Sequence, residues 1–186
     1  GLYWRYESTL KQWDDALYSV VGAAGELFSV RTSLFEPAPP DTLLDDFVLT
    51  LRIAEQGYRI AYAPHAYATE APSASLADEM TRKVRICAGG FQAMSRLRGL
   101  FNPFRHGWLT FQFISHRVLR WTLAPALLPV LFVLNAFLAA MSGGWYAVLF
   151  GGQMIFYGVA GYGAMTHTSP RGPTALYAPF YFCVMN

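Results

Sequence analysis

The chain has 186 residues, of which 54% are hydrophobic and only 14% are charged, whereas a soluble domain carries about 25% charged residues. This composition excludes an ordinary soluble protein and, even more strongly, a disordered chain. The net charge is +2, but the charged side chains are distributed unevenly over three parts of the chain. Residues 1–79 carry five basic and twelve acidic side chains, residues 80–120 carry eight basic and no acidic ones, and residues 121–170 carry no charged side chain.

The first hundred residues alternate helical with extended patterns. Residues 2–19 repeat apolar side chains at helical spacing, which predicts an amphipathic helix. The small residues 22–25 lead into a predicted strand at 26–30, and they form either a tight turn or a place where the backbone closely approaches another group. A proline-rich loop at 37–40 precedes a predicted helix that ends at Gly57.

The order of these segments predicts an α/β fold. Residues 58–62 alternate with a period of two, as expected for a strand. Residues 78–98 form a further predicted helix, which is strongly basic. Helix, strand, helix, strand and helix then follow one another, in a piece too small to be a complete two-layer domain.

Two features of this part could carry chemistry. Asp45 and Asp46 stand side by side at the start of a predicted helix, where a carboxylate either stabilises the helix N-terminus or acts as a general base. The basic cluster on the next helix either faces anionic lipid or neutralises a phosphate group. This cluster consists of Arg82, Lys83 and Arg85.

The remainder of the chain predicts contact with a membrane. Residues 107–120 predict an amphipathic helix at the membrane interface, with a helix packed on a soluble domain as the alternative. Residues 121–141 and 145–165 are uncharged and long enough to cross a hydrocarbon core of about 30 Å, and residues 174–186 look like the start of a third span. A pair of buried core helices is the alternative. The excess of arginine before the first span predicts that the preceding part is cytoplasmic.

The order of the segments resembles membrane-integrated family 2 glycosyltransferases, which include the cellulose and hyaluronan synthase-like enzymes. Leu44-Asp-Asp-Phe-Val-Leu49 and Gly57-Tyr-Arg-Ile-Ala-Tyr-Ala-Pro64 are similar to the family's acidic motif and the stretch after it. Arg82-Lys-Val-Arg-Ile86 occupies the place of the family's QxxRW motif, and residues 22–31 resemble its glycine-rich segment. Residues 3–7 and 115–121 also look like stretches of bacterial members.

The resemblance implies an inverting sugar transfer on part of a GT-A-type α/β domain. Asp46 takes the place of the general base, and Asp45 stands where a supporting glutamate is commoner. Arg85 matches the motif's arginine, which would contact the donor diphosphate. Arg82 replaces the motif's glutamine and Ile86 its tryptophan; because that tryptophan lines the acceptor site of the processive synthases, the resemblance does not imply processivity or the identity of any polymer. Gly25 and Arg31, in the glycine-rich segment, complete the expected substrate-binding residues.

The resemblance also implies partners and a place in the cell. The expected partners are a nucleotide-sugar donor, a polysaccharide or glycolipid acceptor and the lipid bilayer, with no nucleic acid. The expected location is the inner (plasma) membrane of a bacterium, with several spans and the catalytic part in the cytoplasm.

The sequence contains no Asp-x-Asp motif. The donor- and metal-binding half, with its Mg²⁺ or Mn²⁺, is therefore expected to precede Gly1, and the 186-residue chain alone is expected to be inactive. The expected organisation is a catalytic part at 1–100, an interfacial segment at 101–120 and a membrane region at 121–186. A non-enzymatic membrane scaffold or transporter subunit with a cytoplasmic cap is the alternative.

Overall fold

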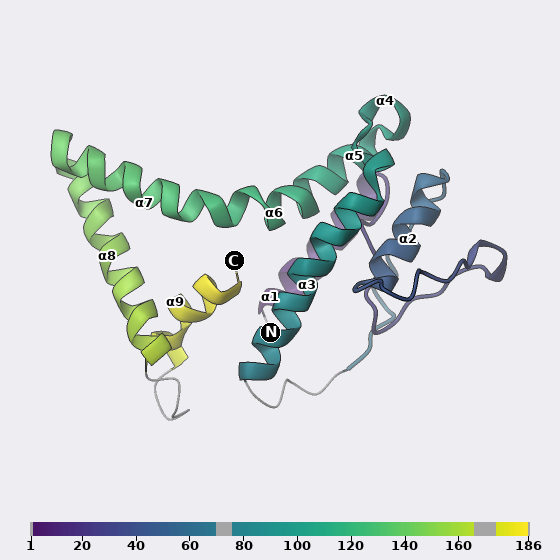
Figure 1. Ribbon diagram of the computed structural model, residues 1–186, viewed down its shortest axis with the longest axis horizontal. Coiled ribbons are helices and arrows are strands. Elements are labelled where there is room, and N and C mark those ends of the chain that lie inside the picture. The colour runs from purple at the N-terminus through teal and green to yellow at the C-terminus, as the bar shows by residue number, and fades with distance from the viewer. Residues whose placement is uncertain (1, 70–75, 166–173, 186) are drawn as a thin grey trace. The chain divides into compact units, whose positions relative to one another are not determined.

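The computed structural model describes residues 2–69, 76–165 and 174–185. These residues form two compact units, Gly1–Trp121 and Thr122–Asn186, and each unit is described by itself. In Figure 1 the first unit contains the labels α1 to α6, and the second contains α7 to α9.

The regular elements of the first unit are helices of very different lengths. The α-helices are α1 (Leu2–Leu17), α2 (Asp45–Glu55), α3 (Leu76–Arg96), α4 (Pro103–His106), α5 (Trp108–Phe113) and α6 (Leu119–Trp121). Two 3-10 helices, Thr32–Leu34 and Arg98–Phe101, and a π-helical turn, Ile114–Val118, lie between them.

The predicted α/β fold, and with it the partial GT-A-type domain, is wrong: across the described ranges every regular element is a helix. Residues 26–30 and 58–62, both predicted strands, are irregular. The extended backbone at Ile60 accepts one backbone hydrogen bond, from the N–H of Val20 at 2.9 Å, and its own N–H donates to the hydroxyl of Ser19 at 2.9 Å. A side chain thus takes the place of the next backbone partner, so the pairing does not continue into a ladder.

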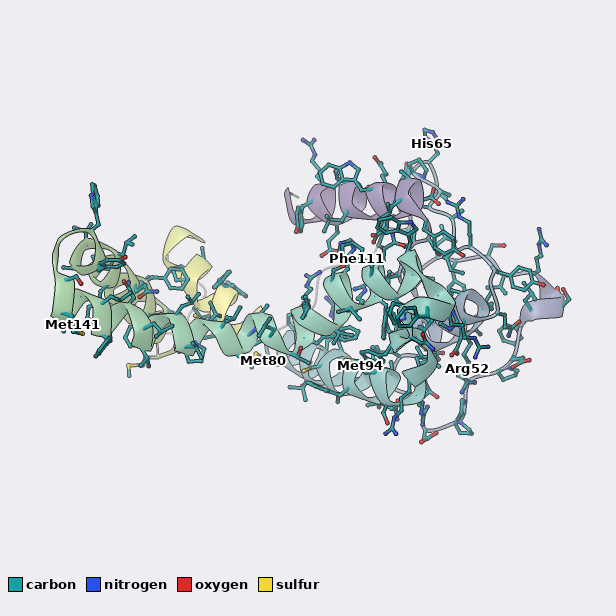
Figure 2. All side chains as sticks on the ribbon, turned by 90° about the horizontal axis from the view of Figure 1, so that it is seen from above. Arg52, His65, Met80, Met94, Phe111 and Met141 are labelled. Atoms are coloured by element: carbon teal, nitrogen blue, oxygen red, sulfur yellow. The ribbon has the colours of Figure 1, made fainter. Side chains whose placement is uncertain are left out.

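The core of the first unit surrounds α2. Seven of the eleven residues of α2 are buried, because the helix is covered on more than one side. The buried cluster comes mainly from α2, from α5 and from the stretch 93–100, which ends α3 and includes most of the following 3-10 helix. It comprises Val21, Phe47, Val48, Leu51, Ala54, Ala93, Leu97, Leu100, Leu109 and Phe113. Met94 of α3 packs against this cluster, whereas Arg52 of α2 is only partly buried (Figure 2).

Helix α1 forms as predicted, but most of its apolar side is exposed and it packs against the rest of the unit through a polar side chain. Of the apolar side chains at the predicted spacing, Tyr6, Trp13 and Leu17 are exposed and Leu10 is half-buried. Among the side chains described for α1, the buried one is Asp14, whose carboxylate accepts a hydrogen bond from the amide of Gln112 at 3.0 Å and lies 2.8 Å from the ring of His116. A polar network therefore attaches α1 to the rest of the unit, and the helical periodicity could not reveal which face would be used.

Helix α5 and the π-helical turn after it form the last part of the first unit. Leu109 and Phe113 of α5 are completely buried in the core. Trp108 and Phe111 are exposed, with their rings edge-to-face at 5.9 Å. The apolar face predicted for residues 107–120 consists of Trp108, Phe111, Ile114 and Val118. The first two are exposed and the last two half-buried, while the core is reached by a different pair, Leu109 and Phe113.

The second unit contains two helices that are long and apolar enough to cross a membrane, α7 (Leu123–Ser142) and α8 (Gly144–Met165). They correspond to the two apolar spans predicted from the sequence. In the described part of this unit no residue of α7 is buried, and α8 buries only small residues near its end. These helices are therefore not packed inside this unit as core helices would be.

The helices of the second unit contact one another through rings and one pair of amides. The turn between α7 and α8 uses two glycines with positive φ, Gly143 at +59° and Gly144 at +54°, a conformation that glycine adopts without steric cost. The side-chain amide of Asn135 donates to that of Gln153 at 3.0 Å. The ring of Phe156 on α8 packs edge-on against Phe182 of α9 (Thr174–Met185).

Candidate active site around Asp46

The two adjacent carboxylates begin α2 but differ in their surroundings. Asp45 is exposed, whereas Asp46 is half-buried. No side chain caps the helix at Leu44, so both carboxylates lie in a first turn whose free N–H groups favour negative charge. Helix stabilisation explains why acidic residues stand here, but it does not explain why one of them is withdrawn from water.

The backbone of Gly25 covers the Asp46 carboxylate. A Cβ atom built on Gly25 would lie 3.0 Å from Oδ2 of Asp46, so only glycine lets the chain come this close without displacing the carboxylate. Burial raises the pKa of Asp46, and repulsion by the carboxylates of Asp45 and Glu26 raises it further. A hydrogen bond from the N–H of Phe47 acts in the opposite direction. Asp46 is the aspartate whose environment favours taking up a proton.

A single hydroxyl joins this loop to the start of α2. Thr50 Oγ1 accepts a hydrogen bond from the N–H of Ala23 at 3.1 Å and donates to the carbonyl oxygen of Asp46 at 2.8 Å. Gly22, with φ at +85°, lies directly against the ring of Phe47. The small residues 22–25 therefore do both things that the sequence left open: they turn the chain, and they allow it to approach α2 closely.

Helix α3 holds the other side of the site. Gln92 accepts a hydrogen bond from the N–H of Leu43 at 3.0 Å and donates to the carbonyl oxygen of Asp41 at 2.8 Å. The guanidinium of Arg96 contacts the hydroxyl of Thr42 and the carboxylate of Asp41, each at 2.5 Å. Helix α3 thus fixes residues 41–43, the segment that leads into α2.

The three predicted binding arginines are exposed. Arg82 pairs with Glu79 at 3.2 Å along α3. Arg85 and Arg31 are exposed, and within the described ranges no hydrogen bond or ion pair joins either of them to Asp46. The structure brings together Gly25 and the two aspartates, while the roles of the three arginines stay predictions.

Two residues near the site could not be identified from sequence spacing. Arg117 donates to the carbonyl oxygen of Val21, and Trp121 packs edge-on against Phe47 with ring centroids 5.5 Å apart. Both lie about 70 or more positions after Asp46 along the chain. The only signal was that they belong to the stretch 115–121, which resembles bacterial family members.

The described part of the chain offers no cluster of side chains that could hold a divalent cation. No three histidine, cysteine, aspartate or glutamate side chains come together there in a way that could hold a metal ion. What these residues offer to a reaction is a positioned carboxylate.

Comparison with known proteins identifies one family. The sequence model for glycosyl transferase family group 2 matches residues 4–160, which is most of the chain. No curated protein and no solved structure matches. The match covers both aspartates, the loop that contacts Asp46 and most of the two long apolar helices.

Proposed function

The chain belongs to glycosyl transferase family group 2, and on this premise we propose that it uses Asp46 as the general base of an inverting sugar transfer. The donor is a nucleotide sugar, and the acceptor is a hydroxyl of a polysaccharide or a lipid-linked sugar. The observation that carries the proposal is the half-buried carboxylate of Asp46 beneath the backbone of Gly25.

The proposed step is a single displacement. The acceptor oxygen forms a bond to the anomeric carbon while the bond from that carbon to the diphosphate oxygen breaks, which inverts the configuration. The acceptor proton passes to the carboxylate of Asp46, and the nucleoside diphosphate leaves with the electron pair. A general base works best when its pKa lies near the working pH, and burial moves the pKa of Asp46 in that direction.

The basic residues have a supporting place in this proposal. The leaving diphosphate carries negative charge that arginine can neutralise through paired N–H donors. Arg85, exposed on α3, is the proposed contact, with Arg82 and Arg31 as further binding residues. Asp45 is proposed to support Asp46. These roles follow from the family resemblance rather than from contacts between these arginines and Asp46.

The membrane location is also part of the proposal. Helices α7 and α8 would cross the bacterial inner membrane as a hairpin, and residues 101–120 would lie at the interface, where the exposed rings of Trp108 and Phe111 suit the headgroup region. The arginines that precede α7 support a cytoplasmic catalytic part, because an excess of arginine and lysine is typical of the cytoplasmic side. A Ser142→Cys variant should react with an impermeant maleimide added outside intact cells; labelling only after lysis would contradict this orientation.

The direct test measures release of nucleoside diphosphate by the complete protein in native membranes, with a panel of nucleotide sugars. Turnover with at least one donor, dependent on an acceptor, is expected. A divalent cation, Mg²⁺ or Mn²⁺, is part of the proposal for the complete enzyme, so EDTA should stop turnover. The isolated 186-residue chain is expected to release none. Absence of turnover with every donor and acceptor offered to the complete protein would favour a membrane scaffold or transporter subunit.

Gly25→Ala is expected to shift the pH dependence of this reaction. The added methyl group would begin 3.0 Å from Oδ2 of Asp46, so the carboxylate shifts by a few tenths of an ångström. The methyl group then removes more water from the carboxylate and raises its pKa further. Because only the ionised base accepts a proton, activity should disappear at a higher pH on the acid side than in the wild type. The pH profile of kcat/KM measures this shift, and an unchanged acid limb would contradict the placement of Gly25.

A further inference from the structure

Arg117 connects the helical segment after α5 to the loop over Asp46. It lies in the π-helical turn Ile114–Val118, and its Nε and Nη2 atoms donate to the carbonyl oxygen of Val21 at 3.2 and 3.0 Å. Val21 is almost completely buried. Two N–H donors of one guanidinium therefore fix a single carbonyl group at the edge of the core, 96 residues away along the chain.

Val21 is the first residue of the loop that covers the carboxylate, residues 21–25. Gly22 turns the chain against the ring of Phe47, and the N–H of Ala23 bonds to Thr50. Gly25 then meets Asp46. Because these contacts follow one another along a short stretch of chain, a fixed carbonyl group at Val21 limits where the last residue of the loop can lie.

The same arginine also contacts the residue next to Asp46. Its guanidinium carbon lies 5.5 Å from the ring centroid of Phe47, within the range of a cation–π contact. The indole of Trp121 packs edge-on against the same ring at 5.5 Å. Gly90 of α3 makes room for this indole, since a Cβ there would lie 2.7 Å from it. Phe47 is thus held between Arg117 and Trp121.

We propose that Arg117 is a positioning residue for Asp46: it holds the loop 21–25 against α2, so that the backbone of Gly25 covers the carboxylate. The inference rests on the proposed function of Asp46 for its catalytic consequence. Arg117 is assigned no part in the reaction itself. It acts through the carbonyl of Val21 and the ring of Phe47.

The chemistry of the side chain makes arginine specific here. A guanidinium offers two donors in one plane to the same oxygen and presents a flat cation to an aromatic ring, whereas lysine offers one rotating ammonium group. Lysine should therefore restore only part of the function, and glutamine, which has no charge, less. The expected order of loop stability is arginine, then lysine, then glutamine.

Hydrogen exchange in the intact membrane protein tests the structural half of the proposal. In Arg117→Gln the backbone amides of residues 21–25 should exchange on the order of tenfold faster, as expected when a charge-assisted contact that closes a local unit is lost. Arg117→Lys should be intermediate. Arg120→Gln is the matched control, because it removes the same charge from the same stretch of chain, where Arg120 pairs with Glu7 of α1 at 2.7 Å.

The pH profile of nucleoside diphosphate release tests the catalytic half. A looser loop admits water to Asp46, which lowers its raised pKa toward the ordinary value. The acid limb of Arg117→Gln should therefore move to lower pH, with a reduced kcat, while Arg120→Gln keeps the wild-type limb. A merely structural role would not move this limb.

The outcomes separate this proposal from the function on which it rests. Unchanged exchange in residues 21–25 of Arg117→Gln would overturn the proposal, as would faster exchange with an unmoved acid limb. If the wild type releases no nucleoside diphosphate, the proposed function fails, and the exchange measurement still decides whether Arg117 holds the loop.

Discussion

Asp46→Asn should reduce the rate of sugar transfer by about 10²–10⁴-fold, the range that a positioned general base contributes. The asparagine side chain has nearly the same shape, so it should preserve the contact with Gly25. It carries no charge, however, and cannot take up the proton of the acceptor hydroxyl. The measurement is nucleoside diphosphate release by the complete protein in membranes, at saturating donor and acceptor.

Asp45→Asn is the matched control for this substitution. It removes the same charge from the same turn of α2, but Asp45 is exposed and Gly25 does not cover it. Its effect on turnover should be much smaller. Equal losses in the two variants, or full activity in Asp46→Asn with the protein folded and inserted, would place the base elsewhere.

The pH dependence of sugar transfer tests the role of Asp46 in a second way. Burial raises the pKa of Asp46, so a larger fraction is protonated, and inactive as a base, at a given acidic pH than for an exposed aspartate. Transfer should therefore fall as the pH decreases through this raised pKa, and the acid limb should lie above the ordinary aspartate value of about 3.9. An acid limb at or below that value would contradict the half-buried environment.

Gly22→Ala should destabilise the first unit by about 2–5 kcal/mol. The backbone of Gly22 has φ at +85°, which costs a side-chain-bearing residue about 1–2 kcal/mol. In addition, a Cβ atom there would lie 2.6 Å from Cε2 of Phe47, and overpacking of this kind typically costs about 1–3 kcal/mol. Because Phe47 follows Asp46 directly, transfer should fall as well.

Gly57→Ala isolates the part of this cost that comes from the backbone. Gly57 has φ at +96°, but nothing lies within 4 Å of a Cβ atom built there. Its alanine variant should lose only the strain energy, about 1–2 kcal/mol. Denaturant unfolding of the purified protein in micelles, followed for both variants, compares them directly. Equal destabilisation would mean that the ring of Phe47 does not press on Gly22.

The sequence predicted several helices well but not the arrangement of the first unit. The apolar periodicity near residues 2–19 and 45–55 correctly indicated helices, and the long uncharged stretches indicated α7 and α8. Alternation at 58–62 suggested a strand, yet only Ile60 of that stretch packs against the core. Alternation of apolar and polar residues indicates which side chains are buried. It does not indicate whether a neighbouring strand pairs with the segment.

The candidate site was predictable to a similar extent. The family resemblance is confirmed at the level of glycosyl transferase family group 2, and it drew attention to Asp45, Asp46 and Gly25, which lie together. The roles assigned to Arg82, Arg85 and Arg31 stay predictions. Arg117 was out of reach, because a contact across 96 residues leaves no periodic trace in a single sequence.

The α7–α8 hairpin has two distinct properties, the hydropathy of its helices and their alignment with each other. The amides of Asn135 and Gln153 bear on the second. Hydropathy governs whether such helices enter a bilayer, and leucine at either position would serve that purpose better. The alignment of α7 with α8 is not set by hydropathy, because lipid chains contact apolar side chains as favourably as another helix does. A slide of one residue shifts a helix by about 1.5 Å, enough to break a 3.0 Å hydrogen bond between the amides. Hydropathy and helix alignment are therefore encoded by different residues, the second by two amides near the middle of otherwise apolar helices.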